Sequence, residues 1–149
     1  MATYENETPT NKMPLTSETE EQLIGAWQMT VTFHEGPLQG HVEMNRVIFA
    51  PDHTFLILLP FPGAGTWRSD VSDAISFSFT ELLNYCADGT CSGYILLTAQ
   101  GSLSKDGTSF AVSGQGVVYS PDGTHLQTNK TSAQAIRIRH NDSQEKNRY

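Results

Sequence analysis

Hydrophobic and polar residues alternate strictly along the chain after Gly25. The apolar members share one face of an extended segment and the polar members share the other: Trp27, Met29, Val31 and Phe33 against Gln28, Thr30, Thr32 and His34. A period of two is typical of a strand with one buried face. We therefore expect the first strand here. Just before it, Ser17 and Glu20 form a capping box that predicts a short helical turn.

Seven further segments are predicted to be strands, and Asp-Gly or Pro-Asp turns separate several of them. They cover residues 41–50, 54–59, 66–69, 74–85, 92–104, 109–120 and 125–139, with residues 60–65 as a loop. Eight strands in an up-and-down order close most simply into a barrel, because closure removes exposed edges. The sequence thus predicts one all-β domain, an eight-stranded antiparallel up-and-down β-barrel over residues 16–139. We expect a disordered tail over 1–15 and a flexible C-terminal tail over 140–149.

Composition and charge narrow the classes of partner. The chain of 149 residues has a formal net charge of −7, whereas nucleic acids and anionic membrane surfaces attract basic patches. Its apolar runs are far shorter than the ~20 residues of a membrane-spanning helix. The N-terminus has neither the basic start nor the apolar core of a secretory signal. We therefore expect a cytoplasmic protein that binds neither nucleic acid nor membrane, and a homo-oligomer is one arrangement that the sequence allows.

The up-and-down order also predicts which loops lie together. The helical turn and the tight turns fall at one end of the barrel, and the longer loops at residues 35–40, 60–65, 86–91 and 121–124 fall at the other. We expect the longer loops to surround the mouth, which places Trp27 at the closed floor. Phe61, between two prolines, is either a gate at this mouth or an exposed side chain in a plain surface turn.

An aromatic and thioether-rich set is predicted to face the barrel interior. Such side chains suit a large apolar ligand with soft shape requirements. The alternative is that they simply fill the barrel as its core. The candidates for binding a substrate are Met29, Phe33, Met44, Phe61, Trp67, Phe77, Phe79 and Tyr85, with Gln115 from a glycine-rich stretch.

Three polar residues are the candidates for catalysis. Glu81 continues the apolar face of the strand before it, and Arg46 and Tyr94 lie on strands that could bring them to the interior. A carboxylate in an apolar barrel is costly unless it is paired or protonated. Glu81 is therefore expected to pair with Arg46 or to act as an acid or base with a raised pKa. The alternatives are a purely structural ion pair, or a bulge that turns Glu81 to solvent.

Other chemistries find less support in the sequence. Cys86 and Cys91 are either two unpaired thiols, a disulfide across one hairpin, or a redox or metal pair. Two ligands alone do not make a zinc site, and the histidines lack metal-binding spacing. Phosphate-loop and serine-nucleophile motifs are absent. We expect neither a metal nor a cofactor.

Gly25-Ala26-Trp27, after a short helical turn, resembles the G-x-W signature of lipocalin and calycin barrels. The resemblance implies that Trp27 plugs the closed end and that Arg137 or Arg139 packs across it. Because the N-terminus lacks a secretory signal, the chain is more similar to allene-oxide-cyclase-like proteins and to small bacterial cyclases of polyketide biosynthesis. In those barrels a flexible polyene is folded before ring closure.

Two functions from different classes follow. The first is a cofactor-free cyclase or isomerase, which holds a hydrophobic, polyketide-like metabolite in a reactive conformer and polarises a carbonyl group through Tyr94, Arg46 or Glu81. The second is a non-catalytic binding protein for a fatty acid or a similar apolar ligand, whose carboxylate pairs with an interior arginine. A barrel with a filled core, working through its surface, is a third alternative.

Overall fold

The computed structural model describes residues 18–70 and 72–139. One helix and eight strands follow one another along the chain: α2 (Glu18–Leu23), β1 (Gly25–Phe33), β2 (Val42–Phe49), β3 (Thr54–Leu59), β4 (Gly63–Ser69), β5 (Ala74–Leu83), β6 (Gly93–Leu103), β7 (Ser109–Tyr119) and β8 (His125–Arg137). The predicted tails at 1–15 and 140–149, and the predicted capping residue Ser17, lie outside the described residues.

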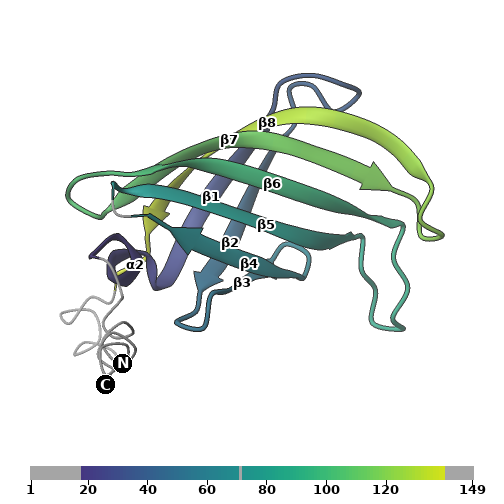
Figure 1. The fold of residues 1–149 in the computed structure, drawn as a ribbon. Helices are drawn as coiled ribbons and strands as arrows, with labels where there is room; N and C mark the ends of the chain where they lie inside the picture. The colour runs from purple at the N-terminus through teal and green to yellow at the C-terminus, as the bar shows by residue number, and fades with distance from the viewer. Residues whose placement is uncertain (1–17, 71, 140–149) are drawn as a thin grey trace, which may run out of the picture.

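Each strand pairs antiparallel with the next, and β8 returns to pair with β1, so the sheet closes into a barrel (Figure 1). The predicted eight-stranded up-and-down barrel is thereby confirmed, and its topology is compatible with a calycin-like fold. The prediction that residues 63–65 form a loop is wrong, because β4 begins at Gly63. A side chain at Gly65 would collide with the carbonyl oxygen of Ser78 on β5, so glycine is what lets these two strands approach.

Asp-containing turns lie in four of the connections between strands. In each turn the aspartate accepts a hydrogen bond from the backbone N–H of the residue two positions later: Asp52 from Thr54, Asp88 from Thr90, Asp106 from Thr108 and Asp122 from Thr124. This local bond satisfies a backbone group that the turn would otherwise leave free. The recurring Asp-(Gly or His)-Thr pattern therefore fixes the hairpins locally.

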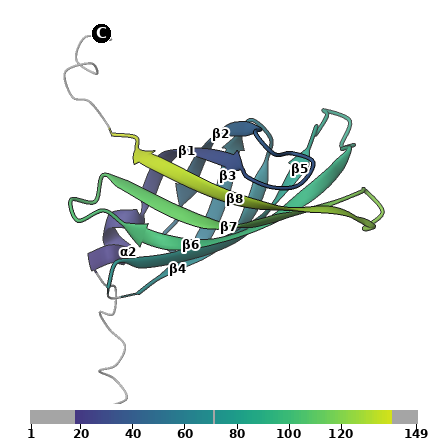
Figure 2. The ribbon, with the colours of Figure 1, turned by 90° about the horizontal axis from the view of Figure 1, so that it is seen from above.

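The helix α2 covers the end of the barrel where β1 begins and β8 ends (Figures 1 and 2). Trp27 is fully buried beneath it, and its indole N–H donates to the carbonyl oxygen of Leu23 at 2.8 Å. The guanidinium of Arg137 lies over the Trp27 ring and donates to the carbonyl oxygens of Ile24 and Gly107. Of the two arginines that the resemblance suggested, Arg137 is the one that packs across the floor.

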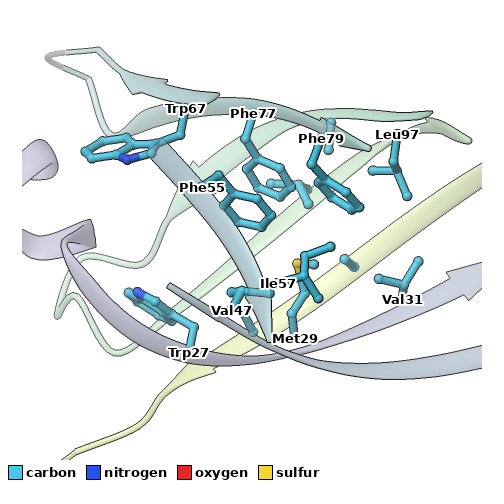
Figure 3. Close-up of a cluster of buried hydrophobic side chains, with 14 of the residues drawn as sticks. Trp27, Met29, Val31, Val47, Phe55, Ile57, Trp67, Phe77, Phe79 and Leu97 are labelled. Atoms are coloured by element: carbon cyan, nitrogen blue, oxygen red, sulfur yellow. The ribbon is translucent and has the colours of Figure 1, made fainter. Parts of the chain in front are cut away.

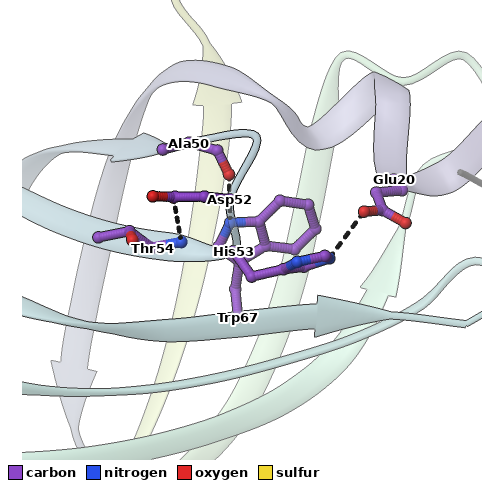
Figure 4. A network of polar contacts seen from close by, with 6 residues as sticks. All are labelled: Glu20, Ala50, Asp52, His53, Thr54 and Trp67. Carbon is purple, nitrogen blue, oxygen red and sulfur yellow. Dashed lines mark hydrogen bonds and ion pairs between the residues drawn. The ribbon is translucent and has the colours of Figure 1, made fainter.

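Polar contacts fasten α2 to the turns beside it (Figure 4). His53 Nε2 lies 2.7 Å from the Glu20 carboxylate, and the His53 ring packs against Trp67 at 4.8 Å between ring centres. The indole N–H of Trp67 donates to the carbonyl oxygen of Ala50 at 3.0 Å. Thr19 on the helix also donates to Asp73 at 2.9 Å. This end of the barrel is therefore closed by specific contacts, as the loop order predicts.

Aromatic side chains fill the interior above this floor (Figure 3). Phe55 stacks on Phe77 at 4.8 Å between ring centres, and Phe49 meets both at edge-to-face angles. The space left between Met29, Phe77 and neighbouring side chains does not admit a water molecule. Packing of this kind matches the density of an ordinary protein core. The closed half of the barrel is therefore core, and inside the barrel only the mouth end is open to a ligand.

Candidate functional site

The prediction that Arg46 and Met44 face the interior is wrong. Residues directly opposed in an antiparallel pair point to the same side of the sheet. Arg46 is opposed to Gln28 on the outer face of β1, whereas Val47 is opposed to the buried Trp27. Both faces of β2 mix apolar and polar residues, so alternation within the strand did not decide between them. The expected ion pair between Glu81 and Arg46 is therefore not formed.

Three further residues predicted to line the interior lie outside it. Tyr94 alternates with the buried Ile95 and stacks on Tyr119 across the outer surface, with ring centres 5.1 Å apart. Gln115 is exposed on β7. Tyr85 follows the end of β5 and is 45% exposed. The strands β6 and β7 carry small or apolar residues on both faces, which hides the inward face in the sequence, whereas the alternation of β5 ends before Tyr85, at Asn84 with a φ of 53°.

The other predicted binding residues separate into two groups. Met29, Trp67, Phe77 and Phe79 do face the interior, but all four are buried within the packed half (Figure 3). Phe33 and Phe61 lie at the opposite end, among the longer loops, and line the same pocket. The structure therefore brings together only part of the predicted binding set, with Phe61 at the position where a gate was expected.

The pocket at this end, which we call the mouth pocket, has a volume of about 620 Å³. It arises because β3 stops at Leu59 while β2 continues, so that residues 42–45 pair with β1 but not with β3. Pro60 and Phe61 border the opening. Its lining is mainly apolar: Phe33, Leu38, His41, Val42, Glu43, Met44, Pro60, Phe61, Leu83, Asn84, Ile95, Val118 and Gln127. Met44, although its side chain is on the outer face of β2, reaches the rim.

A loop over residues 34–41 contributes one wall of the mouth pocket. Asn129 of β8 is fully buried, and its side-chain oxygen accepts a hydrogen bond from the backbone N–H of Leu38 at 3.3 Å. The Asn129 amide donates in turn to Gln127 at 3.1 Å. A side chain at Gly36 would collide with the side-chain oxygen of Asn129. The loop can therefore lie this close to β8 only because residue 36 is glycine. These contacts hold Leu38 against the pocket.

Two carboxyl groups meet beside the mouth pocket: Glu43 lines it, and Glu81 is buried next to Glu43 without lining the pocket itself. Glu81 is 3% exposed, between Phe79 and the pocket residue Leu83 on the inner face of β5. It hydrogen-bonds to Glu43, which lines the pocket from β2. Asn45 donates through its amide nitrogen to Glu43 at 3.0 Å and to the carbonyl oxygen of Leu59 at 3.3 Å. We call Glu43 and Glu81 the carboxyl pair.

Burial and the neighbouring Glu43 together raise the pKa of Glu81 from its ordinary value to about 9. Burial penalises the charged form, and a second carboxylate beside it would add like-charge repulsion. Glu81 therefore holds its proton at neutral pH, beside the carboxyl group of Glu43. One Glu81 oxygen, Oε2, is buried without a hydrogen-bond partner among the described residues. A pair in this state can both donate and accept a proton.

Sequence reasoning found Glu81 but missed its partner. Glu43 and Asn45 share a face of β2 with Val47 and Phe49. These two large apolar residues indicate in the sequence that this face is the inner one. Leu38 and Asn129 were missed because the contact between the loop and β8 joins segments far apart in sequence.

The remaining chemical groups do not gather into a second site. In residues 18–70 and 72–139, no three His, Cys, Asp or Glu side chains lie close enough to hold a metal ion. Cys86 and Cys91 are both free thiols near the mouth end of β5 and β6. The only helix in the described part of the chain, α2, is too short to cross a bilayer.

Comparison with models of known protein families finds no match for this chain, and no curated protein matches it in sequence.

Proposed function

We propose that this protein is a cyclase or isomerase that binds a hydrophobic metabolite in the mouth pocket and acts on it through the carboxyl pair. The observation that carries the proposal is Glu81, a carboxyl group 3% exposed that hydrogen-bonds to Glu43, a residue lining an apolar pocket. Strongly perturbed acids in clefts mark functional sites more often than surface acids do. The resemblance to calycin-like cyclases points to the same class of reaction.

In an isomerisation, the carboxylate of the pair would take a proton from one carbon of the substrate, and the neutral carboxyl would return a proton to another. The pair would end with the single proton that it held at the start. In a ring closure, the apolar wall would hold the chain in a reactive conformer, and proximity alone can contribute several kcal/mol. The neutral carboxyl would then polarise a reacting group by hydrogen bonding.

A non-catalytic binding protein is the second candidate, and the filled closed half of the barrel favours it. Met29, Phe77 and Phe79 leave no room for a ligand there, so a molecule bound inside the barrel would occupy its mouth end. The fatty-acid version of this function has less support, because Arg46, the expected partner of a carboxylate, lies on the outer face of β2.

Turnover in deuterated water separates the two functions. Linear polyenes with a terminal carbonyl group are incubated with the protein, and products are resolved by chromatography and mass spectrometry. An enzyme changes the regio- or stereochemical outcome relative to buffer, or introduces deuterium, and Glu81→Gln lowers this rate about 100-fold or more. Glu35→Gln, which removes an exposed carboxylate from the loop at the same end, serves as the control and retains the rate. If the polyenes bind to the protein but are recovered unchanged, the binding protein is favoured.

A further inference from the structure

The charged side chains that line the mouth pocket indicate the charge of its ligand. Among the described residues that line it, Glu43 is the only one with a carboxylate, and neither lysine nor arginine is present. Among the residues that the structure describes, neither Glu43 nor Glu81 forms an ion pair, and the ion pair in the neighbouring loop joins Lys130 to Glu35. Glu43 is half-buried in this wall, where a carboxylate without a counter-charge is less well compensated than in water. A cation entering the pocket would supply that counter-charge.

The hydrogen-bonding state of the carboxyl pair points the same way. Glu81 hydrogen-bonds to Glu43, and Asn45 gives one further hydrogen bond to Glu43. The other amide hydrogen of Asn45 is directed to the carbonyl oxygen of Leu59. Glu81 Oε2 is left buried and without a partner. With the Glu81 proton engaged in its hydrogen bond to Glu43, the open positions on the pair are acceptors, so a ligand must bring donors.

His41 is the other titratable residue that lines the mouth pocket. Its ring packs beside Phe33, with ring centres 5.6 Å apart, and it is exposed at the rim. It therefore does not provide a buried counter-charge beside the carboxyl pair. Apart from Asn84 and Gln127, the rest of the wall is apolar and fits a hydrocarbon body.

We infer that the ligand of the mouth pocket is an apolar molecule that carries a protonated amine, which Glu43 binds at the pocket wall with the buried Glu81 beside it. The hydrocarbon part lies against Phe61, Leu38 and Ile95, and the ammonium group donates to the carboxyl pair. This inference rests on the pocket to which the proposed function assigns the substrate, and it names the chemical class of that substrate. The overall charge of −7 also favours the approach of a cation.

Three probes of equal chain length test this inference: decylamine, decanol and decanoate, each below its micelle concentration. Isothermal titration calorimetry near neutral pH gives affinity and stoichiometry, and amide NMR shifts locate the site. Decylamine is expected to bind about tenfold or more tighter than decanol, with decanoate weakest, because only the amine neutralises the pair. The shifts are expected around Leu38, Phe61 and Ile95.

Two isosteric variants and one control separate the carboxyl pair from general electrostatics. Glu43→Gln and Glu81→Gln keep the shape of the site, and the double variant is expected to bind amine and alcohol within about threefold of each other. Glu35→Gln removes an equal charge from the loop nearby and retains the full preference. Circular dichroism verifies that each variant is folded.

The inference is overturned if decanoate or decanol binds as tightly as decylamine, if the double variant keeps the amine preference, or if none of the probes binds to the folded protein. These outcomes differ from failure of the proposed function. An amine preference without any turnover would leave the ligand class standing and remove the cyclase or isomerase. Turnover that depends on Glu81, together with a preference for decanoate, would support the cyclase or isomerase and remove the amine as the ligand class.

Discussion

The guanidinium carbon of Arg137 lies 4.6 Å from the centre of the Trp27 ring, so the last strand of the barrel closes over the first. Arg137 also donates to the carbonyl oxygens of Ile24 and Gly107, at 3.2 and 3.4 Å. These two carbonyl groups belong to the segment between α2 and β1 and to the turn between β6 and β7. One side chain therefore joins three parts of the closed end.

Arg137→Ala is expected to lower the free energy of unfolding by about 2–3 kcal/mol, because it removes a cation–π contact and two charge-assisted hydrogen bonds. Urea denaturation measures the loss. Arg139→Ala removes an exposed arginine two residues later and is the matched control, with a change within about 0.5 kcal/mol. Equal losses in the two variants would contradict the closing role of Arg137.

Trp67 is expected to support the fold rather than the ligand. Trp67→Phe removes the N–H that donates to Ala50 and the ring face that packs on His53, at a cost of about 1–2 kcal/mol. Binding of an apolar probe to the mouth pocket stays within about twofold, since Trp67 lies at the closed end. Phe61→Ala is the reciprocal variant, with weaker probe binding and little loss of stability. A strong loss of binding in Trp67→Phe would place the ligand deeper in the barrel.

Two glycines of the loop over residues 34–41 form a natural comparison. Gly36 and Gly40 have backbone φ angles of +89° and +88°, so alanine is strained at both, by roughly 1–2 kcal/mol. Only at Gly36 does the new side chain also collide with Asn129; at Gly40 it meets open space. Gly36→Ala is therefore expected to free the loop, with much faster hydrogen exchange at the Leu38 amide than in Gly40→Ala. Equal exchange rates in the two variants would mean that Asn129 does not anchor the loop.

The carboxyl pair predicts a pH dependence of stability with a definite sign. The pKa of Glu81 rises from 4.5 to about 9 on folding, so the folded protein holds more protons than the unfolded chain between these values. The contribution of Glu81 to stability is therefore complete below about pH 4.5 and is lost as the pH rises towards about 9. Glu81→Gln cannot titrate, so its advantage over the parent protein is expected to grow with pH.

We expect this difference to reach roughly 1–3 kcal/mol near pH 8, measured by urea denaturation of both proteins across the interval. Glu35→Gln, at an exposed position, controls for the loss of one charge. A difference that is constant with pH, or one that shrinks as the pH rises, would contradict the protonated state of Glu81.

The sequence was sufficient for the barrel because its strands carry local signals. The alternation from Trp27 to Phe33, the Asp-containing turns and the order of loop lengths predict strands, hairpins and ends without any long-range contact. The short β4 was harder, since Gly63 and Gly65 have the composition of a loop. Their place in a strand depends on the approach of β5, which no local pattern records.

The candidate site was harder to predict than the fold. Glu81 was recognised because it interrupts a clean apolar face, but β2 has no such face, so the choice between Arg46 and Glu43 depended on the register with β1. A shift of one residue exchanges the two sides of a strand. That single ambiguity changed the predicted partner of Glu81 from a cation to a second acid, and with it the expected charge of the ligand.

The protonation of Glu81 beside Glu43 is the central claim, and the carbon chemical shift of the Glu81 side-chain carboxyl group tests it most directly. Protein labelled with carbon-13 is titrated by NMR, with Glu81→Gln used to assign the signal. We predict that this signal titrates near pH 9 and moves to lower pH in Glu43→Gln, where burial remains but the second acid is gone. A Glu81 signal that titrates near 4.5, or one that Glu43→Gln leaves unchanged, would contradict the account.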